Sequence, residues 1–163
     1  RELCSAVSRE CSKYGYEPVM LTDQLCCQAK EAGSFLASIA KTHCKSGKKL
    51  AYIAGGETIV NITGHGKGGR NQEIALSAAE GIKGMSNAAV FSIGSDGTDG
   101  PTDAAGGYSD GDTAGVLKNK GIDIFEVLKN NDAYNALKLT EGLIITGPTG
   151  TNVNDVSVLL ISD

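Results

Sequence analysis

Residues 88–107 read AAVFSIGSDGTDGPTDAAGG, an apolar run followed at once by a segment rich in glycine and aspartate. The run 88–93 contains Val, Phe and Ile and predicts a buried strand. The segment 94–107 that follows holds three carboxylates: Asp96, Asp99 and Asp103. One Asp-Gly pair is what a surface turn uses, and Asp-Gly turns with a helix cap remain the alternative for this segment. Three carboxylates at the end of one strand favour a functional site.

Helical and extended patterns alternate along the rest of the chain. Apolar residues at helical spacing predict helices at residues 2–14, from Asp23 to near Gly47, 70–83, 110–120, 123–130 and 131–138. Short apolar or alternating runs predict strands at residues 18–21, 50–54, 59–63, 88–93, 143–146 and 156–161. This alternation predicts a single α/β domain over residues 1–163, with a mostly parallel or mixed sheet and helices on both faces. In such sheets ligands bind at loops beyond the carboxyl ends of strands.

The composition excludes several classes of protein. The chain has 163 residues and a formal net charge of −4. It therefore lacks the excess positive charge that attracts nucleic acid or anionic lipid. No apolar run approaches the ~20 residues of a membrane span, and the first residues, RELCSAVSRE, lack the pattern of a signal peptide. The five cysteines are odd in number and have no C-x-x-C spacing, which argues against a zinc site or a disulfide framework. We therefore expect a cytoplasmic protein that acts on small molecules.

Two further loops are rich in glycine. GGET, at residues 55–58, is either a hairpin turn or a place where the backbone approaches a ligand, with Glu57 as its functional side chain. GHGKGGRNQE, at residues 64–73, enters a predicted helix, and the free N–H groups at a helix N-terminus favour a phosphate or carboxylate. Lys67 and Arg70 add positive charge, and Arg70 has the fork for a bidentate grip. We expect an anion cradle formed by Gly66, Lys67, Gly68, Gly69, Arg70 and Asn71.

The same loop matches the dinucleotide fingerprint G-x-G-x-x-G at Gly64, Gly66 and Gly69. That fingerprint normally follows a continuous apolar strand and precedes an acidic residue ~20 positions later. Here the preceding run alternates, and the first strand-end carboxylate is Asp96, well beyond that distance. Nicotinamide binding therefore stays an alternative, and no Walker A sequence is present.

The spacing of the three aspartates is too irregular for an EF-hand calcium loop. Hard carboxylate oxygens at a strand end suit Mg²⁺, which takes one or two carboxylates and completes its shell with water and phosphate oxygens. We expect Asp96, Asp99 and Asp103 to hold such an ion or to accept a substrate proton.

A fourth loop, TGPTGTNVND at residues 146–155, lies between the last two predicted strands. Its hydroxyls, amides and glycines can bind a polyhydroxylated or phosphorylated ligand, although such residues also form ordinary polar turns. The candidate binding residues are Thr149, Gly150, Asn152 and Asn154, whereas Asp155 is expected only to close the turn.

In this order GGET, GHGKGGRNQE, GSDGTDGPTDAAGG and TGPTGTNVND resemble the C-terminal, MOFRL-type portion of the class II glycerate kinases, a family also named hydroxypyruvate reductases. The resemblance runs from about Tyr14 to Ile161, with Ser95 where the family often has Thr and Gly107 where it often has Ala. It implies transfer of the γ-phosphoryl group of ATP to glycerate, usually at the 2-hydroxyl to give 2-phosphoglycerate, with Mg²⁺ as cation. Family members also carry a larger N-terminal domain that this sequence lacks, and their active cleft lies between the two domains.

The kinase hypothesis assigns a role to each loop. Phosphoryl transfer needs positioning and neutralisation of charge on the moving group by Lys, Arg and Mg²⁺. Arg70 and Lys67 would face phosphate or the glycerate carboxylate, and Asp96 and Asp99 would be the catalytic carboxylates. The residues that would orient oxygens are Asn71, Thr149, Asn152 and Asn154, with Glu57 and Glu73 as weaker candidates. The chain would form one wall of the cleft and is expected to be inactive alone.

Two other classes of function remain open: a nicotinamide-dependent hydroxypyruvate reductase and a non-catalytic metabolite-binding module. A homodimer, the identity of the catalytic base and the choice between a fragment and a natural short protein also stay open. Each of these functional hypotheses requires the four loops to lie together on one side of the molecule.

Overall fold

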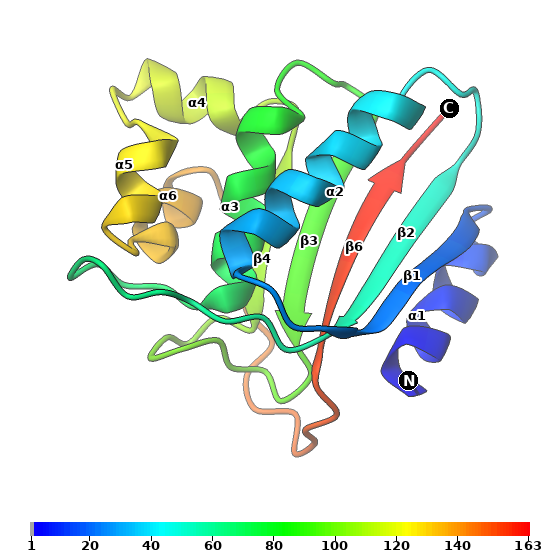
Figure 1. Cartoon of the computed structure of the whole chain (residues 1–163), viewed down its shortest axis with the longest axis horizontal. Helices are drawn as coiled ribbons and strands as arrows, with labels where there is room; N and C mark the ends of the chain where they lie inside the picture. Colours follow the sequence, from blue (N-terminus) through cyan, green and yellow to red (C-terminus); the bar gives the residue numbers. More distant parts are fainter. Residues whose placement is uncertain (1) are drawn as a thin grey trace.

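The computed structural model describes residues 2–163 and shows a six-stranded sheet with six helices in this range, which confirms the α/β class (Figure 1). The strands are β1 (Glu17–Leu25), β2 (Leu50–Gly56), β3 (Ala88–Gly94), β4 (Gly106–Asp110), β5 (Leu143–Ile144) and β6 (Asp155–Ile161). The helices are α1 (Glu2–Lys13), α2 (Ala29–His43), α3 (Arg70–Gly81), α4 (Thr113–Asn119), α5 (Ile124–Lys129) and α6 (Ala133–Leu139). None of these helices is long and apolar enough to cross a membrane.

The sheet is mixed, which is one of the two arrangements predicted. Its strand order is β1-β2-β6-β3-β4-β5, and β1 and β2 are the one parallel pair among the described strands. A mostly parallel sheet does not form, because the last strand of the chain inserts between β2 and β3 and runs opposite to both. As a result the carboxyl ends of β2 and β3 meet the amino end of β6 at one edge of the sheet. There Asp155 pairs in register with Gly56 on one side and Gly94 on the other.

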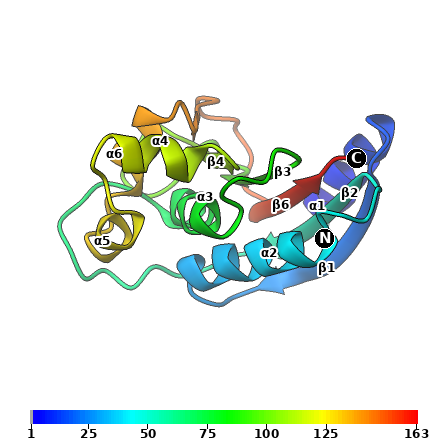
Figure 2. The same ribbon diagram turned by 90° about the horizontal axis from the view of Figure 1, so that it is seen from above.

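Helices cover both faces of the sheet, as predicted (Figure 2). Side chains alternate between the two faces along β6. Val156 and Val158 lie on one face and pack with Cys4 of α1. Leu159 and Ile161 lie on the other face, in the core cluster formed with α2 and α3. The sheet is therefore the middle of three layers, with α1 on one side and the remaining helices on the other.

Helix α3 lies at the centre of the helical layer and is buried on nearly all sides. Its residues 71–79 are all buried, as is typical of a helix enclosed by other elements. It packs against the sheet and α2 on one side and against the core formed with α4, α5 and α6 on the other (Figure 2). The packing against α2 is close, because a Cβ atom on Gly33 would lie 2.2 Å from the carbonyl oxygen of Ile74. This enclosure fixes the first turn of α3, which carries Arg70.

Residues 57–69 form an extended loop, so the predicted strand at residues 59–63 is wrong. Among the described residues, one isolated bridge connects this loop to another segment, between Gln28 and Ile59. Both edges of β2 are already paired, with β1 and β6, which leaves residues 59–63 no strand to join. The side-chain oxygen of Asn131 accepts hydrogen bonds from the N–H groups of Thr63 and Gly64 and holds the loop instead.

Two further elements differ from the prediction. The sequence does not predict β4, because Gly106 and Gly107 have low strand propensity. Packing selects glycine at Gly106, since a Cβ atom there would lie 1.9 Å from the carbonyl oxygen of Ser92. Strand β1 continues through Asp23, the residue predicted to cap the next helix, and α2 begins later, at Ala29.

Candidate functional site

The four loops identified in the sequence lie at one edge of the sheet. They leave or enter β2, β3 and β6 at that edge, and together with the start of α3 they gather at the lower side of Figure 1. The strand order explains this arrangement, because antiparallel β6 brings its amino end beside the carboxyl ends of β2 and β3. The convergence on which the functional hypothesis depends is therefore confirmed.

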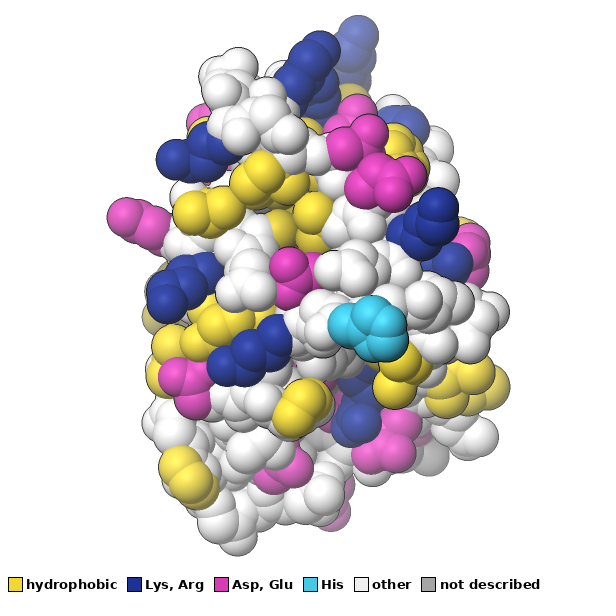
Figure 3. Space-filling view, turned by 90° about the vertical axis from the view of Figure 1, so that its left-hand side faces the viewer, with side chains coloured by type: hydrophobic (Ala, Val, Ile, Leu, Met, Phe, Trp, Pro, Cys, Tyr) yellow, Lys and Arg dark blue, Asp and Glu magenta, His cyan; other side chains and the backbone are white. Residues whose placement is uncertain are grey.

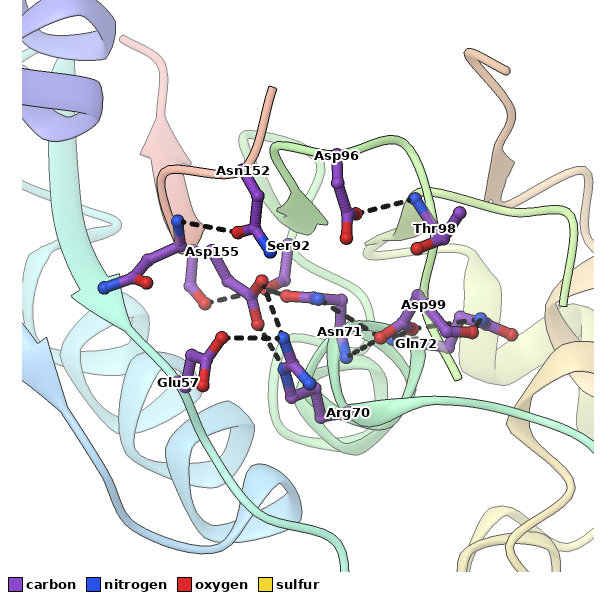
Figure 4. Close-up of polar contacts among 12 residues, drawn as sticks. Glu57, Arg70, Asn71, Gln72, Ser92, Asp96, Thr98, Asp99, Asn152 and Asp155 are labelled. Atoms are coloured by element: carbon purple, nitrogen blue, oxygen red, sulfur yellow. Dashed lines mark hydrogen bonds and ion pairs between the residues drawn. The ribbon is translucent and has the colours of Figure 1, made fainter. Parts of the chain in front are cut away.

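Arg70 and Asp155 form an ion pair at the centre of this edge (Figure 4). Nε and Nη2 of Arg70 donate to the two carboxylate oxygens of Asp155, the second at 3.1 Å. Nη2 also donates to Oε1 of Glu57 at 3.3 Å. The hydrogen bond to Asp155 raises the pKa of Arg70 above its ordinary value. The Asp155 side chain is 8% exposed and that of Arg70 is 35% exposed. The buried carboxylate therefore fixes the orientation of Arg70, and part of the Arg70 side chain stays accessible.

Asp99 caps the first turn of α3. One carboxylate oxygen accepts the backbone N–H of Asn71 at 3.1 Å, and the other accepts that of Gln72 at 2.9 Å. The side-chain amides of the same two residues donate to this carboxylate as well. Glycine is needed at Gly69, because a Cβ atom there would lie 2.4 Å from Cγ of Asp99. The anion cradle predicted at the start of this helix is thus filled by a carboxylate of the chain itself.

The carboxyl group of Asp99 is almost fully enclosed, with 2% of the residue exposed. Burial raises its pKa, and the hydrogen bonds from Asn71 and Gln72 oppose that rise. With four donors on its two oxygens, Asp99 has a structural role at the start of α3 in this arrangement.

A chain of buried polar groups continues from Asp99 into the sheet. Nδ2 of Asn71 donates to Asp99 at 3.2 Å, and Oδ1 of Asn71 accepts the hydroxyl of Ser92 at 2.5 Å. Ser92 in turn lies 2.8 Å from the hydroxyl of Ser157 on β6. Asn71 is fully buried, so the structure places it below the site, where it positions α3 rather than facing solvent.

The glycine loop before α3 is anchored to the turn between α5 and α6. The backbone N–H of Gly66 donates to the carbonyl of Asn130 at 2.8 Å, and that of Lys67 donates to Oδ1 of Asp132 at 2.9 Å. The loop also lacks a preceding strand, so the strand-turn-helix context of the dinucleotide fingerprint is not formed. Gly68 packs against the neighbouring loop, with its carbonyl beside Gly100.

Lys67 and Asp103 belong to a second cluster. The Lys67 ammonium lies 4.0 Å from the centre of the Tyr134 ring, and the Tyr134 hydroxyl donates to Asp103 at 2.8 Å. That hydrogen bond lowers the pKa of Asp103. These two predicted site residues therefore lie together but contact α6, whereas Arg70 contacts β6 and Glu57.

Asp96 remains beside the Arg70–Asp155 pair. Its Oδ1 accepts the N–H of Thr98 at 2.9 Å, which lowers its pKa. Figure 4 shows Asp96 and Asn152 pointing from their loops towards the ion pair. Asp96 is half-buried, so its carboxylate keeps an accessible side at the rim.

The loop before β6 is joined to the loop after β3. The N–H of Thr149 donates to the carbonyl of Asp96 at 3.1 Å, and its hydroxyl donates to the carbonyl of Ser95. Gly150 and Asn154 have positive φ angles of 74° and 72°, and the N–H of Asn154 donates to Oδ1 of Asn152 at 3.4 Å. Thr149 therefore fixes the loop, and Asn152 is the side chain of this loop that faces the ion pair.

The three aspartates predicted to share a metal do not come together. Asp99 lies under α3, Asp103 binds Tyr134, and Asp96 stands at the rim. Within residues 2–163 no group of three or more His, Cys, Asp or Glu side chains is placed to hold a metal ion. Of the three, Asp96 is the one that points towards the Arg70–Asp155 pair in Figure 4.

Sequence reasoning missed Asp155 as the partner of Arg70. The sequence did contain a signal: Asp155 comes directly before the apolar run Val156–Ile161. In the structure it is the first residue of the central strand β6 and is buried. A buried carboxylate requires a partner. The identity of that partner depends on the strand order, which the sequence pattern does not contain.

Charges of both signs are mixed on the face of the molecule that Figure 3 shows, and no continuous basic patch forms on that face. A nucleic-acid backbone requires such a patch. The mixed charges on this face agree with the net charge of −4.

Comparison with known proteins gives a consistent result. The MOFRL family matches residues 50–155. The chain is 50% identical over 165 residues to D-glycerate 2-kinase of Thermotoga maritima, a match that covers 99% of this chain and 40% of that protein. It is 45% identical over 164 residues to glycerate 2-kinase of Pyrococcus horikoshii, covering 98% of this chain and 37% of that protein.

A crystal structure of glycerate kinase from Thermotoga maritima has the same fold. It superposes with a TM-score of 0.93 at 51% identity, covering 97% of this chain and 39% of that one. The chain thus spans about 40% of the length of the relatives it matches.

Proposed function

The chain belongs to the MOFRL family, and on that premise we propose that it forms one wall of the active site of a glycerate 2-kinase. The γ-phosphoryl group of ATP passes to glycerate: a bond forms between the 2-hydroxyl oxygen and phosphorus, and the bond from phosphorus to the ADP oxygen breaks. The hydroxyl proton is released to water, and the products are 2-phosphoglycerate and ADP. The named activity of the relatives supports this proposal. The remaining part of a longer protein supplies the opposite wall, so the chain alone is inactive.

The observation that carries the proposal is the fixed position of Arg70. Phosphoryl transfer asks the protein for positioning and for charge neutralisation. Asp155 and Glu57 bind Nε and Nη2 of Arg70, and Nη1 has no hydrogen-bond partner among the described residues. Since the Arg70 side chain is 35% exposed, its guanidinium can bind a phosphate or the glycerate carboxylate without changing its orientation.

Asp96 is the residue of this chain that would hold Mg²⁺. Its lowered pKa keeps the carboxylate ionised and makes it a weak proton acceptor. When bound, Mg²⁺ supplies neutralisation of charge on the phosphate oxygens. Asn152, which points towards the same space in Figure 4, would orient a substrate oxygen there.

The reductase alternative loses its structural basis. A nicotinamide dinucleotide needs free N–H groups in the fingerprint loop and at the helix start. The N–H groups of Gly64 and Gly66 donate to Asn131 and Asn130, and Asp99 occupies the helix start. We therefore keep the kinase as the proposed function.

The test uses the longer protein that contains this chain, supplied with ATP, Mg²⁺ and D-glycerate. ADP release is measured in a coupled assay, and ³¹P NMR identifies the phosphorylated hydroxyl. We expect one 2-phosphoglycerate per ADP. We also expect Arg70→Lys to lower kcat/KM by about 100-fold or more, because an ammonium lacks the planar fork that binds both oxygens of Asp155 and keeps a further N–H group aimed at a phosphate.

Arg9→Lys, an exposed substitution on α1, is the matched control and is expected to keep wild-type kinetics. ATP hydrolysis without phosphoglycerate would contradict the proposal, and so would a protein that oxidises NADH with hydroxypyruvate but does not phosphorylate glycerate. Unchanged kinetics in Arg70→Lys would contradict the role of Arg70.

A further inference from the structure

A pocket of about 550 Å³ lies beside Arg70, between residues 57–62, the start of α3 and residues 100–101. Its volume is within the range of small-molecule sites, roughly 300–1,000 Å³. Its aliphatic lining residues are Ile59, Val60, Ile62 and Pro101, and the rest of the lining consists of four glycines and the polar residues Glu57, Thr58, Arg70, Glu73 and Asn131. Ile59 and Ile62 are 61% and 78% exposed, so large apolar side chains line a space that is open to solvent.

Two buried polar residues line the same pocket. Thr58 is 5% exposed, and its hydroxyl has no hydrogen-bond partner within residues 2–163. Glu73 is 4% exposed, and one of its carboxylate oxygens accepts Nδ2 of Asn131 at 2.9 Å, whereas the other has no partner among the described residues. A buried polar group without a partner is costly and rare in native proteins. The Thr58 hydroxyl is such a group. The second carboxylate oxygen of Glu73 is not enclosed and is a further acceptor among the residues that line the pocket. Together they indicate a ligand that supplies hydrogen bonds.

The pocket also includes Arg70, so a ligand within it reaches the guanidinium. The lining calls for three features in one molecule: an apolar flat body for the aliphatic walls, hydroxyl or amino groups for Thr58 and Glu73, and an anionic end for Arg70. Glycerate has three carbons and is polar throughout, so it has no apolar surface to bury against the aliphatic side chains. A nucleotide has all three features, in its base, its ribose hydroxyls or exocyclic amine, and its phosphates.

We propose that this pocket binds the nucleoside part of ATP, with the base between Ile62 and Pro101, hydrogen bonds to Thr58 and Glu73, and the phosphates directed towards Arg70. The proposal rests on the kinase function proposed above and adds the location of the phosphoryl donor. Glycerate then binds on the other side of Arg70, near Asp96 and Asn152.

The test measures nucleotide binding and kinetics in the longer protein that contains this chain. Thr58→Val replaces the hydroxyl by a methyl group of similar size and breaks no hydrogen bond of the free protein. We expect the Kd for ADP, measured by calorimetry, and the KM for ATP to rise by about fivefold to tenfold. The KM for glycerate and the melting temperature should stay as in the wild type.

Ile62→Asp is the second variant. Because Ile62 is 78% exposed, the substitution leaves the fold intact, and it places a charge against the base. We expect a rise of about tenfold or more in the Kd for ADP. Thr42→Val, on the exposed side of α2, is the control and should change none of these values.

The outcomes separate this inference from the proposed function. If both variants keep the wild-type Kd for ADP while glycerate is phosphorylated, the pocket assignment is wrong and the kinase function stands. If glycerate is not phosphorylated but ADP binds and both variants weaken it, the pocket assignment stands and the function is wrong. A rise in the KM for glycerate alone would assign the pocket to the acceptor and overturn the inference.

Discussion

Asp155 binds Nε and Nη2 of Arg70 with its two carboxylate oxygens and so joins the first residue of β6 to the first turn of α3. The two residues are 85 positions apart in the chain. Asp155 also pairs in register with Gly56 and Gly94, so the ion pair lies where three strand ends meet. The orientation of Arg70 therefore depends on the insertion of β6 between β2 and β3.

Removal of the charge on Asp155 should destabilise the protein. Asp155→Asn leaves the guanidinium of Arg70 without its buried carboxylate, and we expect a loss of about 1–3 kcal/mol in the free energy of unfolding, since Arg70 is partly solvated. Urea denaturation followed by circular dichroism measures this loss. Glu57→Gln is the control, because Glu57 is 54% exposed and its contact with Arg70 should be worth at most about 0.5 kcal/mol. Equal losses in the two variants would show that Asp155 is not the principal partner.

Asp99 should matter for stability far more than Asp103, although both belong to the same aspartate-rich loop. Asp99→Asn places an amide against donors from Asn71 and Gln72, and we expect a loss of about 2–4 kcal/mol in unfolding free energy from the lost cap and the unpaired donors. Asp103→Asn, at an exposed position, should leave the unfolding free energy nearly unchanged. Urea denaturation of the two variants side by side decides the matter, and similar midpoints would refute the capping role.

The outcome for these aspartates shows what the sequence could predict about the site. The pattern of strand followed by glycine and carboxylates indicated correctly that the loops converge at one edge. It could not indicate that Asp99 meets the start of α3, because that contact depends on the packing of α3 against β3 and β4. For the same reason Lys67 and Arg70, three positions apart, contact different elements.

The fold was predictable where the local pattern and the tertiary environment agree. Residues 70–83, 88–93 and 156–161 form the expected helix and strands nearly within the expected bounds. Residues 59–63 have a strand pattern but no free strand edge to join. Gly106 and Gly107 lack a strand pattern but form a strand in a crowded place, Gly106 against β3 and Gly107 against α3. Both errors arise because pairing partners and close packing are properties of the assembled chain.

Glu73 should make the stability depend on pH. Burial raises its pKa in the folded protein, so the folded state binds the proton more tightly than the unfolded state, in which the pKa of Glu is about 4.3. The contribution of Glu73 to stability is therefore complete below that value and is lost as the pH rises through the raised pKa, by about 1.4 kcal/mol for each unit of difference.

Glu73→Gln removes this titration. We expect Glu73→Gln to be as stable as the wild type near pH 4 and more stable near pH 7, because the amide still accepts a hydrogen bond from Asn131 and carries no charge to bury. Denaturation curves at several pH values measure the difference between the two proteins. Glu80→Gln, an exposed substitution on the same helix, is the control. A difference that does not grow with pH would show that burial does not raise the pKa of Glu73.

The contact between α2 and α3 depends on the absence of a side chain at Gly33. A Cβ atom there would lie 1.9 Å from Oγ of Ser77 and 2.2 Å from the carbonyl oxygen of Ile74, and the carbonyl cannot move without moving α3. We expect Gly33→Ala to lower the unfolding free energy by about 1–3 kcal/mol through overpacking. Gly115→Ala is the matched control within a helix, since no atom lies within 4 Å of its added Cβ, and it should raise stability by about 0.5–1 kcal/mol. Thermal unfolding of both variants measures the two effects, and stabilisation by Gly33→Ala would mean that the helices are less tightly packed than the structure shows.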